Sequence, residues 1–162
     1  MSNFISNTSK ALKTSLWILL LANISTAFAH NHGLQAQKSL YQRLGGLEPV
    51  AVVVSDFIDA IVPDPMLNKN RAISISRKSV AVPYLKYQVT AMVCQATGGP
   101  CKYTGRNMKD AHAHLRIKEK EWDRMIVLFK EVLKKHRLSD KITEELLAIV
   151  QSSKKDIVIP SM

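Results

Sequence analysis

The chain lacks the sequence signatures of several large protein classes. It contains no CxxC, HExxH or glycine-rich phosphate-binding pattern. Its scattered Asp and Glu residues form no recognisable carboxylate pair or Ser-His-Asp arrangement, so we assign no catalytic residue. No strand alternation, internal repeat or low-complexity block is present. The sequence therefore predicts an all-α fold.

Acidic residues are also scarce, because 13 Asp and Glu stand against 23 Lys and Arg, giving a net charge of +10 over 162 residues. A basic balance can indicate nucleic acid or an anionic surface as a partner. However, the cations are spread along the whole chain and are not interleaved with aromatic residues. We therefore expect no nucleic-acid partner.

The apolar run near the start, residues 16–24 (LWILLLANI), is short for a membrane span and is interrupted by Asn23. Lys10 and Lys13 precede it, and Ala27-Phe28-Ala29 follows it. This order predicts a secretory signal peptide over residues 1–29, with an uncleaved anchor as the alternative. We expect an exported, periplasmic protein, unattached to the membrane after cleavage, with a disordered N-terminus over 30–37 and one domain over 38–158.

Only two cysteines are present, Cys94 and Cys101, seven residues apart across the turn Gly98-Gly99-Pro100. In an oxidising compartment a disulfide between them is one option. Two separate thiols, with Cys94 buried on a helix face, are the other. The spacing does not decide, because it does not fix the distance between the two Cα atoms.

Apolar residues recur at intervals of three and four in most of the remaining chain, which predicts amphipathic helices. Residues 66–82 indicate a loop with one or two short helical turns, and the tail 154–162 is expected to be frayed. The predicted helices are a short one capped by Ser39, then 47–62, 83–96, a short one capped by Asn107, 118–137 and 140–153.

The segment 97–117 combines two glycine turns with the pair His112 and His114. Residues two apart on a helix point about 200° apart, so only one of these imidazoles can face inward. Its apolar neighbours Met108 and Leu115 make His112 the inward candidate and leave His114 to solvent. From the residues alone, a structural histidine bonded to a core carbonyl is the favoured role for His112.

Two parts of the chain resemble the truncated (two-over-two) globins of the first group. The resemblance is carried by paired glycine turns and a Met-x-x-x-His motif, and it extends more loosely over about 120 residues. The matching residues are Leu40-Tyr41-x-Arg43-Leu44-Gly45-Gly46, Val52-Val53-Val54, Asp56-Phe57, Thr97-Gly98-Gly99-Pro100, Tyr103-Thr104-Gly105 and Met108-Lys109-x-x-His112.

This resemblance implies a helical sandwich around a b-type haem, with His112 as the proximal iron ligand. It places the haem-contacting positions at Phe57, Ile58, Leu85, Val89, Met108 and Leu115. At Ile58 the family usually carries a Tyr whose hydroxyl donates a hydrogen bond to the bound gas. A one-residue shift would exchange Val89 for Gln88. Candidates for the haem propionates are Arg71, Lys86 and Arg106, with ordinary solvated charges as the alternative.

The family also usually carries a Phe-Phe pair after the second helix, which here falls near Asn70-Arg71. The function implied is reversible binding or transport of oxygen, nitric oxide or carbon monoxide, with an unidentified reductase as a further partner. The alternatives are a nitric-oxide dioxygenase or peroxidase-like haem enzyme, and a degenerate globin fold without haem. The apolar pocket implied by Ile58, Leu85 and Val89 weakens the enzyme alternative.

Overall fold

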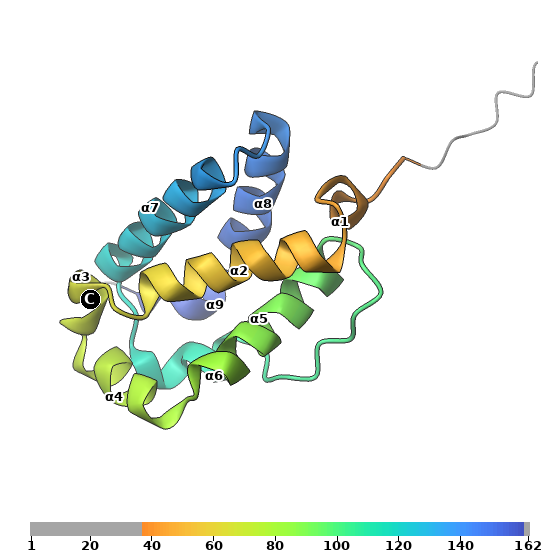
Figure 1. Ribbon diagram of the computed structural model, residues 1–162. Helices are drawn as coiled ribbons and strands as arrows, with labels where there is room; N and C mark the ends of the chain where they lie inside the picture. Colours follow the sequence, from red (N-terminus) through yellow and green to blue (C-terminus); the bar gives the residue numbers. More distant parts are fainter. Residues whose placement is uncertain (1–36, 161–162) are drawn as a thin grey trace, which may run out of the picture. The chain divides into compact units, whose positions relative to one another are not determined.

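The computed structural model describes residues 37–160, and all its regular elements are helical (Figure 1). The predicted signal peptide, 1–29, lies outside these residues. Within them one isolated bridge joins Ile117 and Val158 and no strand forms, so the all-α prediction is confirmed. The helices are α1 (Leu40–Arg43), α2 (Leu47–Ile61), α3 (Pro65–Asn68), α4 (Arg71–Ser79), α5 (Val82–Ala96), α6 (Met108–His112), the 3₁₀ turn η1 (Ala113–Leu115), α7 (Glu119–Lys135), α8 (Asp140–Ser152) and α9 (Lys154–Ile157).

Helix α2 packs against both α5 and α7 (Figure 1). Its residues Val50, Val54 and Ile58 are buried and lie four residues apart, part of the apolar spacing that predicted this helix. They form one apolar cluster with side chains of α5. Phe57, next on the same helix, turns toward α7, where its ring meets Phe129 edge-on at a centroid distance of 5.1 Å.

A second apolar cluster joins α1, α7 and α8 through Leu40, Phe129, Leu133 and Leu146. Phe57 packs against this cluster as well as the first. It therefore links the α2–α5 pair of helices to the α7–α8 pair. In the part of the chain described, no helix is long and apolar enough to cross a membrane.

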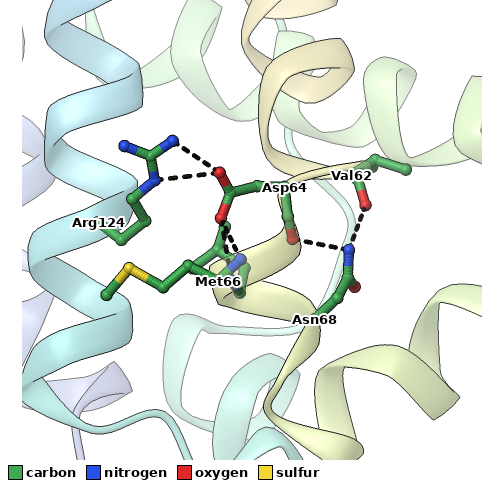
Figure 2. A network of polar contacts seen from close by, with 6 residues as sticks. Val62, Asp64, Met66, Asn68 and Arg124 are labelled. Carbon is green, nitrogen blue, oxygen red and sulfur yellow. Dashed lines mark hydrogen bonds and ion pairs between the residues drawn. The ribbon is translucent and has the colours of Figure 1, made fainter.

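A buried carboxylate fixes the corner where α2 gives way to α3 (Figure 2). Asp64 is 5% exposed, and its Oδ2 accepts hydrogen bonds from Arg124 Nε at 3.0 Å and Nη2 at 2.8 Å. Its Oδ1 accepts the first backbone N–H groups of α3, from Met66 and Leu67. Arg124 is the largest cause that holds the pKa of Asp64 below its usual value, so the carboxylate stays charged although it is buried.

Two expectations were wrong. Residues 66–82 contain the nine-residue helix α4, because the Asn70 side chain accepts the N–H groups of Ala72 and Ile73 and starts a helix that has few apolar residues. The tail is ordered as far as Ile159, whose N–H donates to Ile117 O at 2.8 Å. A backbone contact between segments 42 residues apart leaves no local pattern in the sequence.

Candidate functional site

The chain turns sharply after α5, as the glycine cluster predicted. Gly98 adopts a φ of +83°, which side-chain-bearing residues rarely adopt. At Gly99 a Cβ atom would lie 2.7 Å from Cys94 Sγ, so only glycine fits there. Cys94 and Cys101 form a disulfide, which settles the open alternative in favour of the bridge.

Two hydrogen bonds between backbone and side-chain atoms hold this loop beyond the disulfide. The N–H of Tyr103 donates to Gln95 Oε1 on α5 at 2.7 Å, and the Tyr103 hydroxyl donates to Arg106 O. Asn107 then caps α6 by accepting the N–H of Asp110 at 2.8 Å, which confirms the predicted Asn cap. The loop therefore delivers α6 from a fixed starting point.

His112 is the half-buried residue at the end of α6. Its Nδ1 lies 2.8 Å from Met108 O, the geometry of an N–H donating to a carbonyl. Burial lowers the pKa of His112, so the neutral imidazole is favoured. With the proton on Nδ1, the lone pair is on Nε2, which has no hydrogen-bond partner within residues 37–160.

The hydrogen bond from Nδ1 to the Met108 carbonyl fits the role of a structural histidine. At the same time it leaves Nε2 of His112 available to coordinate a metal. A carbonyl that receives the Nδ1 proton fixes both the tautomer and the ring orientation of a ligating histidine. His114 is exposed and its Nε2 lies 3.4 Å from Ser76 Oγ, so the two rings diverge as helical geometry predicts.

The wall expected to face His112 is formed by α2 and α5. Ile58 is 1% exposed, and Leu85 and Val89 are half-buried against the cluster that contains it. We call these three residues the α2–α5 wall. None of them carries a hydrogen-bond donor on its side chain.

Gln88 lies outside this cluster. Its amide Nε2 donates to the Tyr84 hydroxyl at 3.0 Å, while its Oε1 is buried without a partner among the described residues. The packing therefore favours the register in which Val89, and not Gln88, belongs to the wall. Sequence reasoning missed the Tyr84–Gln88 pair, for which the four-residue spacing on one helix was the available signal.

The other predicted contact residues take different positions. Met108 and Leu115 are half-buried on either side of His112, whereas Phe57 is engaged with Phe129. Of the cations proposed for propionates, Lys86 is paired with Asp59 at 2.7 Å. Arg106 is near enough for its charge to contribute to lowering the pKa of His112.

A depression of about 650 Å³ opens beside α6. Arg106, Asp110, Ala113 and His114 line one side, and residues of α4 with Val80 line the other. Within residues 37–160 no three His, Cys, Asp or Glu side chains gather as they would around a bare metal ion. A single neutral imidazole as the protein's ligand suits an iron whose other ligands come from a porphyrin.

The fold and this site define a small helical globin of the two-over-two class. The sequence profile of the bacterial-like globin family matches residues 39–158, and the chain belongs to that family. Within it, the chain is a group I truncated globin.

Two relatives are named group 1 truncated hemoglobin. The protein from Tetrahymena pyriformis is 22% identical over 75% of this chain and 95% of its own length. The one from Tetrahymena thermophila is 23% identical over 76% and 97%.

Solved structures share the fold. Truncated hemoglobin from T. pyriformis in its Fe(III) form aligns with a TM-score of 0.65 at 22% identity, over 76% of this chain and all of that one. The 2/2 hemoglobin from Synechococcus sp. PCC 7002, in the cyanomet state with covalently attached heme, aligns with a TM-score of 0.64 at 21% identity. The alignment covers 75% of this chain and 98% of the Synechococcus protein.

Proposed function

We propose that this globin binds a b-type haem through His112 Nε2 and reversibly binds oxygen or another diatomic gas. Haem held by His112 would supply an iron atom that can bind such a gas. The observation that carries the proposal is the His112–Met108 hydrogen bond, which leaves one imidazole nitrogen with its lone pair available. The named relatives, both truncated hemoglobins, support the same function.

We assign His112 and Met108 to the side that holds the iron, and the α2–α5 wall to the side that faces the bound gas. Met108 O holds the imidazole of His112 in one orientation, and burial keeps it neutral and able to coordinate. On the other side, the α2–α5 wall excludes water and offers no donor to the bound gas. A neutral hydrogen bond contributes about 0.5–1.5 kcal/mol, so we expect oxygen to dissociate faster than from globins with a distal Tyr. Carbon monoxide and nitric oxide depend less on such a donor.

Hemin titration of the purified protein tests this proposal. The wild type should take up hemin in about equimolar amount and develop an intense Soret band, as globins do. His112→Ala should lose that band, whereas His114→Ala is the matched control, because it removes the neighbouring exposed imidazole from the same segment. Equal bands in both variants would reject His112 as the ligand, and no uptake by the wild type would support a globin fold without haem.

We also propose that the protein is exported and acts in an oxidising compartment. The signal-like residues 1–29 suggest export, and the Cys94–Cys101 disulfide is of a kind that persists in secreted and periplasmic proteins. Mass spectrometry of the protein from its native cells tests the proposal. A chain beginning at His30 and carrying no free thiol supports it, whereas a chain that retains residues 1–29 contradicts it.

A further inference from the structure

A second depression, of about 510 Å³, lies between the start of α4 and the segment that leads into α7. We call it the basic depression, because positively charged side chains dominate its lining. Ala72 and Ile75 contribute apolar surface, and Glu121 is the single acidic residue. The lining cations are Lys69, Arg71, Arg116, Lys118 and Lys120.

Four of these five cations lie close together in one depression without a carboxylate partner among residues 37–160. Elsewhere Arg43 pairs with Glu145, Lys135 with Asp56 and Lys154 with Glu119. Within the described residues, no carboxylate comes within 4.0 Å of Lys69, Arg71, Arg116 or Lys118. Like charges gathered without partners repel one another, and this repulsion is relieved when an anion binds among them.

Glu121 does little to neutralise the group. It is 4% exposed, and its Oε2 accepts the backbone N–H of Lys118 at 2.9 Å. Its Oε1 lies 3.6 Å from Lys120 Nζ, a single weak pairing. The depression therefore keeps an excess of positive charge.

The backbone strengthens this charge. Helix α4 begins at Arg71 and α7 begins directly after Lys118, so two helix N-termini, with their partial positive charge, adjoin the basic depression. Arg116 adopts the left-handed conformation, with φ of 49° and ψ of 48°, which is unfavourable for a residue with a side chain. Asn70 Nδ2 donates to Leu115 O at 3.0 Å and joins the two sides of the depression at this turn.

We propose that the basic depression binds a small polyanion with closely spaced phosphate groups. Its volume lies within the usual range for small-molecule sites, and arginine and lysine together suit multiple phosphate oxygens. A free polyphosphate and an anionic membrane surface, on which neighbouring lipid headgroups each carry a phosphate, share this chemistry. Neither His112 nor the α2–α5 wall lines the depression. Arg71 does line it and is also a candidate for a haem propionate, so competition with hemin is part of the test.

Calorimetric titration with phosphate, pyrophosphate and tripolyphosphate tests the site. Affinity should rise with each added phosphate group and fall with salt concentration. Arg71→Gln combined with Arg116→Gln should weaken tripolyphosphate binding about tenfold or more, since two charge-assisted contacts are lost. A parallel arm uses phosphatidylglycerol–phosphatidylcholine vesicles in place of tripolyphosphate. Weakening in that arm alone identifies a lipid headgroup, and weakening in either arm supports the site.

Arg77→Gln combined with Arg137→Gln is the matched control. Arg77 lies on α4 outside the depression, and Arg137 has the same left-handed backbone, with φ of 51°. This double variant has the same net charge as the test variant and should bind like the wild type. Equal weakening of both double variants, or no binding in either arm, would overturn the proposal. Displacement of tripolyphosphate by one equivalent of hemin would assign these cations to haem propionates and would also overturn it.

Discussion

The segment that carries His112 and the α2–α5 wall are held in place by different kinds of interaction. Residues 97–117 depend on directional links: the Cys94–Cys101 bridge, the Asn107 cap and the backbone bond from Ile159 to Ile117. The wall depends on apolar packing around Ile58. The difference teaches that the orientation of the histidine is set by a few specific contacts, whereas the wall can change its chemistry while the helices stay packed.

The reason lies in the size of the elements. Helix α6 has five residues, none of them buried, so it is too short to be stable alone and contributes little to the core. Helices α2 and α5 have fifteen residues each and contribute buried side chains. Specific links replace packing where packing is insufficient.

Of the changes considered, removing the disulfide should have the largest effect on stability, and it should affect residues 97–117 more than the α2–α5 wall. Cys94→Ser combined with Cys101→Ser should lower the free energy of unfolding by about 2–3 kcal/mol, measured by urea denaturation. Hydrogen exchange should accelerate in residues 97–117 and stay slow around Ile58. Reduced wild type is the matched control and should behave like the variant. Equal acceleration in both regions would show that the two are not held separately.

Substitution of Asp64 tests the end of α2, where hydrogen bonds and an ion pair hold the chain in place of apolar packing. Asp64→Ala should cost at least about 1 kcal/mol of unfolding free energy, because α3 loses its cap. The pKa of Asp64 is lowered in the folded protein, so its contribution is complete above about pH 4 and is lost as the pH falls through that lowered pKa.

Urea denaturation at pH 7 and below pH 4 measures this dependence. The difference between wild type and Asp64→Ala should shrink in acid. Asp59→Ala, which removes an exposed partner of Lys86, should have a smaller effect. A difference independent of pH would show that the charge of Asp64 does not matter.

The wall itself gives the smallest predicted effect. Ile58→Tyr should slow oxygen dissociation from the hemin-reconstituted, reduced protein about two- to tenfold, because a hydroxyl donor is introduced. Stopped-flow displacement by carbon monoxide measures the rate. Val52→Tyr places the same side chain on the exposed face of α2 and should leave the rate unchanged. An unchanged rate in Ile58→Tyr would remove Ile58 from the distal side.

Much of the fold could be predicted from local pattern. The 3.6-residue period gave α2, α5 and α7 to within one or two residues at each end, and helical geometry predicted that His112 and His114 diverge. Helix α4 was not predicted, because its start depends on the Asn70 side chain and not on apolar spacing. Helix α9 was not predicted because its residues have no distinguishing local pattern. The backbone hydrogen bond that orders the tail is donated by Ile159 to Ile117, which is distant in the sequence.

The candidate site was predicted from the family resemblance and not from local pattern. The resemblance assigns His112 as the iron ligand, and an ungapped match assigns Ile58, Leu85 and Val89 to the opposite side; both assignments stay predictions. The disulfide could not be decided, because seven residues of separation do not determine the Cα–Cα distance, which is 5.7 Å here. The basic depression joins residues 69–75 with 116–121, and only folding brings these ranges together.

Rescue by free imidazole tests the central assignment most directly. His112→Gly removes the proposed ligand and leaves space where a small imidazole can enter. We expect this variant to show no Soret band with hemin alone and to gain one when imidazole is added, while His114→Gly matches the wild type in both conditions. Hemin uptake by His112→Gly without imidazole, equal to that of the wild type, would contradict the account.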